Sequence, residues 1–165
     1  MEREFIEMIN THRGIIFKVC RMYDRENRYR DDLFQEIVLQ LWKSFPGFRD
    51  EALPSTWMYR VALNTAITHF RKQKRKPEQQ SLSAAELRIS DPSAGQEDNG
   101  QAALLNRAID QLTSIEKALI MLYLEEKNYN EISEIMGITT NHVGVKLNRI
   151  KTKLEQKINP RKNES

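Results

Sequence analysis

The chain has 165 residues, carries 26 Lys and Arg against 23 Asp and Glu, and contains one cysteine, Cys20. This length allows one ordinary domain or two small ones, and a single cysteine excludes an intramolecular disulfide. The first ten residues are too charged for a secretory signal, and no stretch of about 18 apolar residues predicts a membrane span. We therefore expect a protein of the reducing cytoplasm, with Cys20 packed among apolar neighbours rather than acting as a nucleophile.

The positive charge is concentrated in two segments. Residues 55–76 contain six Lys or Arg and no acidic residue, and residues 137–162 contain seven against a single Glu. Clustered positive charge of this kind is typical of a protein that binds nucleic acid. Basic helices that serve a membrane surface or solubility are the alternatives.

Apolar spacing predicts three helices in the first half of the chain. Residues 5–23 have helical spacing, either as one helix or as two that meet near Gly14. Residues 32–42 place Leu, Ile and Leu on one face, and a loop over residues 45–54 follows. The third helix is expected from about Ser55 to Lys74.

The composition changes from residue 77 to residue 103, where Gln, Ser, Pro and Gly accompany five acidic residues and one Arg. Such a segment buries too little apolar surface to offset its ordering entropy, so we predict a flexible acidic linker. A second helical region follows, in which Thr113 and Glu116 form a capping-box pattern. No segment shows the alternation of apolar and polar residues that is typical of a β-strand. We therefore predict an all-α fold with two small helical domains, residues 1–76 and 104–165.

A helix-turn-helix pattern extends from residue 128 to residue 154. Asn128 and Glu131 have the spacing of a capping box, which pairs two amides at the start of a helix. Gly137 can adopt the positive φ that ends this helix, and Thr139 can cap the next one.

The second helix of this pair has one apolar and one polar face. Its apolar residues recur every three or four positions from Val143 to Ile158, as expected for a buried face. Amide, cationic and small side chains on the other face can contact base edges and phosphates. A solvated helical hairpin is the alternative, but the combined caps, glycine and apolar positions favour a DNA-reading helix. The polar-face residues are Asn141, His142, Val145, Asn148, Arg149 and Thr152, flanked by Lys146, Lys151 and Lys153.

The helix over residues 55–76 combines aromatic residues with a basic end. Single-stranded nucleic acid requires flat side chains that stack on bases and cations that follow the backbone. We nevertheless assign Trp57 to the core, since it is in register with Val61. The basic end has two explanations: favourable interaction of the cations with the helix dipole, and nucleic-acid binding. We favour nucleic-acid binding.

No pattern predicts catalysis, a cofactor or a metal site. The glycines form no phosphate-binding signature, and His12, His69 and His142 lack the spacing of metal ligands. Asp31 and Asp32 beside Glu36 are better explained by a helix cap and a solvated face than by paired catalytic carboxylates. We expect neither enzymatic activity nor a bound cofactor.

Three segments, in this order, resemble the extracytoplasmic-function (ECF) group of bacterial RNA polymerase sigma factors, in the sigma-70 family. Residues 32–42 resemble the segment that docks onto the clamp helices of RNA polymerase. Residues 55–64 and the basic end after them resemble the promoter-melting helix, and residues 112–154 resemble the domain that reads the minus-thirty-five element. The resemblance implies a cytoplasmic initiation factor that binds core RNA polymerase and promoter DNA and that is held inactive by an anti-sigma factor.

The resemblance also implies roles for individual residues. Residues 1–76 would form a region 2-like domain and residues 104–165 a region 4-like domain. The polymerase-binding residues would be Asp32, Phe34, Gln35, Glu36 and Leu39. The minus-ten residues would be Phe48 and Asn64 at a base pocket formed around residues 45–54, with Thr68, Arg71, Lys72, Lys74 and Arg75. The minus-thirty-five residues would be Thr140, Asn141, His142, Val145, Lys146, Arg149 and Lys153.

The chain departs from the family pattern at two positions. Thr68 stands where many members carry an acidic residue, and Gly144 stands where members often carry a cation. Glycine weakens a helix by roughly 1 kcal/mol relative to alanine unless close approach to DNA compensates. Two other functions remain open from the sequence: an operator-binding regulator that does not bind polymerase, and a helical protein-interaction module whose basic ends serve solubility.

Overall fold

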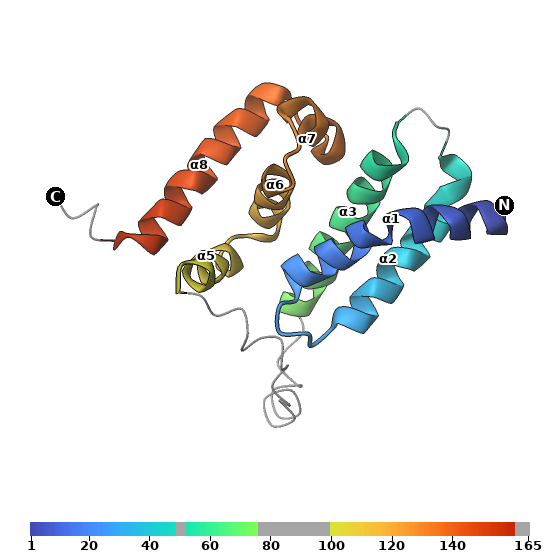
Figure 1. The fold of residues 1–165 in the computed structure, drawn as a ribbon, viewed down its shortest axis with the longest axis horizontal. Coiled ribbons are helices and arrows are strands. Elements are labelled where there is room, and N and C mark those ends of the chain that lie inside the picture. The colour runs from blue at the N-terminus through green and yellow to red at the C-terminus, as the bar shows by residue number, and fades with distance from the viewer. Residues whose placement is uncertain (49–51, 76–99, 161–165) are drawn as a thin grey trace.

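The computed structural model describes residues 1–48, 52–75 and 100–160, and the side chains of 73–75 lie outside this description. All regular elements in these ranges are helical, which confirms the all-α prediction. Figure 1 shows two groups of helices, one from each end of the chain. None of the described helices is long and apolar enough to cross a membrane.

The N-terminal group contains three long helices that pack on one another. A non-helical residue, His12, with φ −115° and ψ 17°, kinks the first helix two residues before the predicted weak point at Gly14. The third helix lies within one residue of its predicted bounds. The elements are α1 (Glu2–Tyr23), α2 (Arg30–Ser44), the short 3-10 helix η1 (Phe45–Gly47) and α3 (Pro54–Arg75).

The core of this group follows the apolar spacing of the sequence. Leu33, Ile37 and Leu41 on α2 have no exposed surface, as expected for one helical face. Cys20 on α1 is also fully buried, and burial raises the pKa of its thiol to about 11. A protonated thiol without solvent contact is a poor nucleophile, which agrees with the packing role expected from the sequence.

The C-terminal group contains four helices, with α8 packed on α5, α6 and α7. The capping box at the start of α6 is present: Thr113 N donates to Glu116 Oε1 at 2.9 Å, and Glu116 N donates to Thr113 Oγ1 at 3.2 Å. These elements are α5 (Gly100–Asp110), α6 (Ser114–Leu124), α7 (Tyr129–Met136) and α8 (Thr140–Ile158). The first turn of α5 occupies residues predicted as linker, and residues 76–99 of that linker lie outside the described part of the chain.

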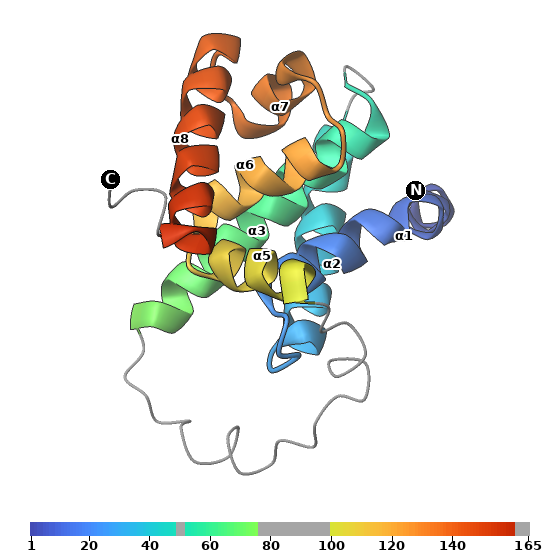
Figure 2. The same ribbon diagram turned by 60° about the vertical axis from the view of Figure 1, so that its left-hand side comes forward.

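The two groups of helices contact each other. α6 lies beside α1 and α3 in both Figure 1 and Figure 2, and α7 also contacts α3. The hydroxyl of Tyr23 donates to the carbonyl oxygen of Ser114 at 2.6 Å, and Arg25 pairs with Asp110 at 2.7 Å. These partners are 85 to 91 residues apart, so hydrophobic spacing within each domain did not predict their contact.

Candidate nucleic-acid interface

The turn between α7 and α8 has the predicted local geometry. Asn128 Oδ1 accepts from Glu131 N at 2.8 Å, and Glu131 Oε1 accepts from Asn128 N at 3.1 Å. Gly137 ends α7 in the left-handed conformation with φ +71° and ψ +31°. Thr139 then caps α8 by accepting from His142 N at 3.1 Å. Each device predicted from the sequence is confirmed, and together they orient α8 relative to α7.

The predicted polar face of α8 is exposed. Val143, Leu147, Ile150 and Leu154 are buried, and the opposite side of the helix faces solvent. Exposed amide, imidazole and guanidinium groups along one helix can reach base edges and phosphates. The exposed members of the predicted set are Thr140, Asn141, His142, Val145 and Arg149, whereas Lys146 is half-buried.

Lys153, also predicted to contact DNA, has an intramolecular partner. Its Nζ donates to both carboxylate oxygens of Glu116, at 2.9 and 3.2 Å. Partial burial opposes ionisation of Glu116, but hydrogen bonds from Thr113 and Lys153 outweigh it and lower the carboxyl pKa. Lys153 therefore neutralises an acidic residue beside the basic helix. The sequence did not reveal this pair because its members are 37 residues apart.

The second predicted DNA surface lies on α3. Asn64, Thr68, Arg71 and Lys72 are exposed, while the side chains of Lys74 and Arg75 lie outside the described residues. Since 64, 68, 71 and 72 are three or four positions apart, they share one side of the helix. The helix therefore presents amide, hydroxyl and cationic groups together.

Phe48 and Trp57 form the aromatic part of this region. Their rings are stacked, with centroids 4.8 Å apart and an interplanar angle of 29°. Trp57 is 8% exposed, which confirms its assignment to the core, and Phe48 is half-buried. Residues 49–51 of the predicted base-pocket loop lie outside the described part of the chain.

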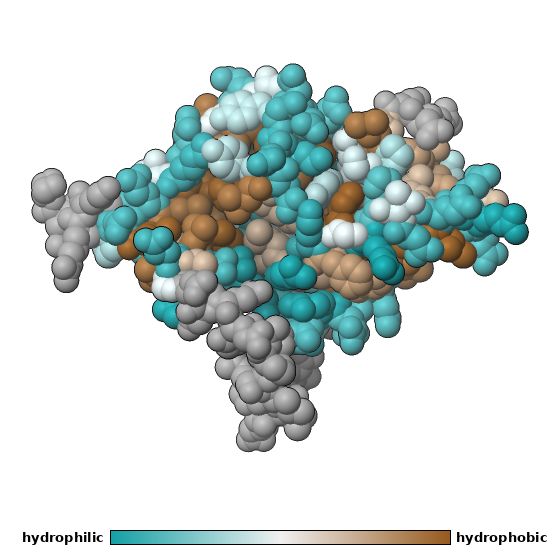
Figure 3. Space-filling view, viewed as in Figure 1, coloured by the Kyte–Doolittle hydropathy of each residue, from teal (hydrophilic) through white to brown (hydrophobic). Residues whose placement is uncertain are grey.

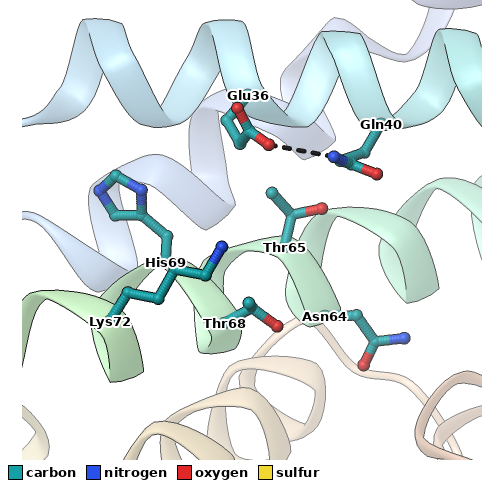
Figure 4. Close-up of a pocket in the computed structure, with 7 residues that line it drawn as sticks. All are labelled: Glu36, Gln40, Asn64, Thr65, Thr68, His69 and Lys72. Carbon is teal, nitrogen blue, oxygen red and sulfur yellow. Dashed lines mark hydrogen bonds between the residues drawn. The ribbon is translucent and has the colours of Figure 1, made fainter. Parts of the chain in front are cut away.

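A cavity of about 410 Å³ lies between α2 and α3, and its described lining is polar. Figure 4 shows Glu36 and Gln40 on α2 facing side chains of α3, with Lys72 extending toward α2. Gln40 Nε2 donates to Glu36 Oε1 at 3.0 Å. The cavity thus joins residues predicted for polymerase and for DNA. It also contains Thr65 and His69, which lie outside the predicted site set, and Gln40, which sequence reasoning missed although it follows Glu36 by one helical turn.

Three of the five predicted polymerase-binding residues on α2 are exposed. Asp32 and Gln35 are exposed, Leu39 is 44% exposed, and Glu36 is half-buried at the cavity. Phe34 is half-buried, and its ring lies 5.0 Å from that of the exposed Phe17 on α1. α2 therefore presents charged, amide and apolar groups together, a mixture suited to a protein partner.

Figure 3 shows an apolar area between α8, α5 and α6. Leu104 on α5 and Ile115 on α6 are each more than two-fifths exposed. Exposed apolar areas of this kind often mark protein–protein contacts. Within the described ranges, no group of three or more His, Cys, Asp or Glu side chains could hold a metal ion.

Comparisons with known proteins match both halves of the chain to the same family. The model of Sigma-70 region 2 matches residues 8–76, and the model of Sigma-70, region 4 matches residues 102–154. The RNA polymerase sigma factor HrpL of Pseudomonas syringae pv. syringae is 31% identical over 135 residues, which cover 79% of this chain and 73% of HrpL. The ECF RNA polymerase sigma-E factor of Haemophilus influenzae is 26% identical over 140 residues, which cover 78% and 74% of the two chains.

A solved structure supports the fold. The sigma factor RpoE from Bartonella quintana, crystallised with the anti-sigma factor NepR, superposes with a TM-score of 0.65 at 14% identity. The match covers 99% of this chain and 98% of that one. The similarity therefore extends over both helical groups.

Proposed function

This chain belongs to the ECF group of the RNA polymerase sigma-70 family, whose members direct the polymerase to particular promoters, and we propose how its two helical domains divide this task. Sigma factors are initiation factors rather than enzymes, and this chain directs promoter-specific initiation with RNA polymerase. In our proposal it has no catalytic activity of its own and acts in the cytoplasm. The domains are residues 1–76 and 104–165, with the first turn of α5 added to the second.

The polymerase-binding surface in this proposal is α2. The exposure of Asp32, Gln35 and Leu39 supports it, because these side chains are available to a partner without unfolding the core. Phe34 and Glu36 would border the contact. Charged and apolar groups together would give both orientation and buried area.

The minus-ten surface in this proposal is the exposed side of α3 together with Phe48. Asn64 and Thr68 would contact an unpaired base, and Phe48 would form an aromatic wall. Opening DNA requires a stacking and hydrogen-bonding environment that replaces the duplex. Arg71 and Lys72, with Lys74 and Arg75, would bind phosphates near the melted junction.

The minus-thirty-five surface in this proposal is the exposed face of α8. The observation that carries the proposal is that this face is polar, solvent-exposed and fixed by caps at both ends of the preceding turn. Asn141, His142 and Val145 would read base edges, and Thr140, Lys146 and Arg149 would bind phosphates. Lys153 would contact DNA either after its ion pair with Glu116 breaks or while it keeps that pair.

We also propose that an anti-sigma factor holds the chain inactive. NepR is such a partner for the similar RpoE, and the apolar area between α5, α6 and α8 offers a surface for a protein. The anti-sigma factor would have to bind this area with an apolar segment, since polar groups would lose hydration there without gaining hydrogen-bond partners.

Reconstituted transcription tests the proposal. Purified core polymerase is incubated with a pool of promoter fragments, with and without this protein. Start sites that share two spaced elements and appear only with the protein would support the proposal. Unchanged core activity in the presence of stoichiometric protein would refute it.

A further inference from the structure

The ring of Tyr129 covers Gly144. Tyr129 is the first residue of α7, and Gly144 lies in the second turn of α8. A Cβ atom on Gly144 would lie 3.2 Å from Cε2 of Tyr129, 3.9 Å from Cδ2 and 4.0 Å from Cζ. The 3.2 Å separation is tighter than an ordinary van der Waals contact, so a side chain at 144 would displace the ring.

This contact lies beside the exposed face of α8. At about 100° per residue, Gly144 is roughly 40° around the helix from Asn148, which is exposed together with Asn141. The Tyr129 ring therefore lies next to the exposed face of α8 and enlarges the surface that this face presents. Tyr129 is 41% exposed, and among the described residues no hydrogen-bond partner is found for its hydroxyl.

We propose that Tyr129 is a further DNA contact, whose hydroxyl donates a hydrogen bond to a phosphate at the edge of the groove entered by α8, and that Gly144 makes room for it. The inference rests on the proposed role of α8. In a helix-turn-helix the first helix crosses the DNA backbone, and tyrosine hydroxyls are among the groups that bind phosphate oxygens. A tyrosine at the start of α7 is therefore placed for the backbone rather than for a base.

The proposal also accounts for Gly144. Glycine in a helix interior is unfavourable, and this position is neither a turn nor a residue with positive φ. Its benefit is the space that it leaves for the tyrosine ring. Tyr129 would thus supply a neutral phosphate contact beside the position where related proteins often carry a cation.

The test uses the holoenzyme, that is, this protein bound to core polymerase. A short duplex carrying the minus-thirty-five sequence is first selected from a random library by wild-type holoenzyme. Tyr129→Phe keeps the ring over Gly144 and removes only the hydroxyl. We expect it to weaken binding about tenfold or more, as for one hydrogen bond to a charged group, without changing the melting temperature or base preference.

Tyr123→Phe is the matched control. Tyr123 on α6 is 39% exposed, and Lys151 Nζ lies over its ring at 4.1 Å from the centroid. We expect this variant to bind as the wild type does. A Tyr129→Phe protein with wild-type affinity, or an equal loss in both variants, would overturn the proposal. If wild-type holoenzyme selects no sequence at all, the proposed role of α8 fails instead.

A second pair of variants tests the part played by Gly144. Gly144→Leu should push the ring away and weaken binding at least as much as Tyr129→Phe. If displacing the ring weakens binding only because the hydroxyl loses its phosphate contact, the double variant Tyr129→Phe/Gly144→Leu should bind no more weakly than Gly144→Leu alone. Losses that multiply in the double variant would show that the two residues act separately and would overturn this part.

Discussion

The two predicted DNA surfaces are built in different ways. The α7–α8 surface depends on devices within one continuous segment: a capping box at Asn128, a left-handed glycine at 137 and a threonine cap at 139. The α3 surface depends on side chains brought together from separate elements: Phe48 is stacked on Trp57, and Lys72 lines a cavity that α3 shares with Glu36 of α2. The first is therefore specified locally and the second by tertiary packing.

This difference has a functional consequence. A duplex reader must present a rigid helix to a regular groove, whereas a melting surface must receive an irregular, unpaired strand. In our proposal, local capping serves the first requirement, and a polar cavity between two helices together with an aromatic pair serves the second.

The largest expected effect is on α2, which shares its cavity with the α3 surface. Glu36→Arg places a cation in the cavity that already contains Lys72 and reverses charge on the predicted polymerase-binding side. We expect about a hundredfold weaker binding to core polymerase, corresponding to roughly 3 kcal/mol, measured by titration with labelled protein. Glu7→Arg, on an exposed part of α1, is the control. Equal binding by both variants would contradict the assignment of α2.

The next effect tests local specification at the turn. Gly137 has φ +71°, and a β-branched side chain there is strained, so Gly137→Val should reduce the free energy of unfolding by about 2 kcal/mol. Gly14→Ala is the contrasting variant, because Gly14 lies within α1 with no atom near its would-be Cβ, and it should be neutral or stabilising. Denaturant unfolding measures both. The account of the turn is wrong if the valine variant is as stable as the wild type.

A smaller effect separates base reading from phosphate binding on α8. Asn141→Ala or His142→Ala should change base preference, with about 1.5 kcal/mol less discrimination at one position. Arg149→Ala should weaken all sequences alike and reduce the salt slope by about one. Binding of the three holoenzyme variants to a library of minus-thirty-five duplexes checks this. An equal loss across all sequences for Asn141 and His142 would reject their assignment.

The smallest effect concerns pH. The pKa of Glu116 is lower in the folded protein than its ordinary value of 4.5, so its stabilising contribution is present above pH 4.5 and is lost as pH falls through the lowered value. We expect Glu116→Gln to be less stable than the wild type by up to about 1 kcal/mol at pH 7, with discounting for partial exposure. The difference should shrink in acid. A constant difference down to pH 3 would contradict the ion pair with Lys153.

The sequence predicted what depends on near neighbours. The α8 faces, the caps at Asn128 and Thr113 and the buried stripe on α2 follow from spacing of three or four residues, and the structure confirms them. The Glu116–Lys153 pair and the contact of Tyr23 with Ser114 could not be predicted, because nothing in local spacing records which distant elements meet. The cavity was not predicted, because Glu36 was assigned to polymerase and Asn64 and Lys72 to DNA, and local spacing does not record that α2 and α3 bring them together.

Probing the same promoter for duplex contact and for strand opening tests the two-surface account most directly. Footprinting reports protection of the minus-thirty-five element, and permanganate reactivity reports unpaired thymines near minus ten. With Asn64→Ala holoenzyme, the account predicts a retained footprint and reduced opening. With Arg149→Ala, it predicts a weakened footprint and normal opening once the complex is saturated. If both variants lost footprint and opening in equal proportion, the two surfaces would not divide the task, and the account would be contradicted.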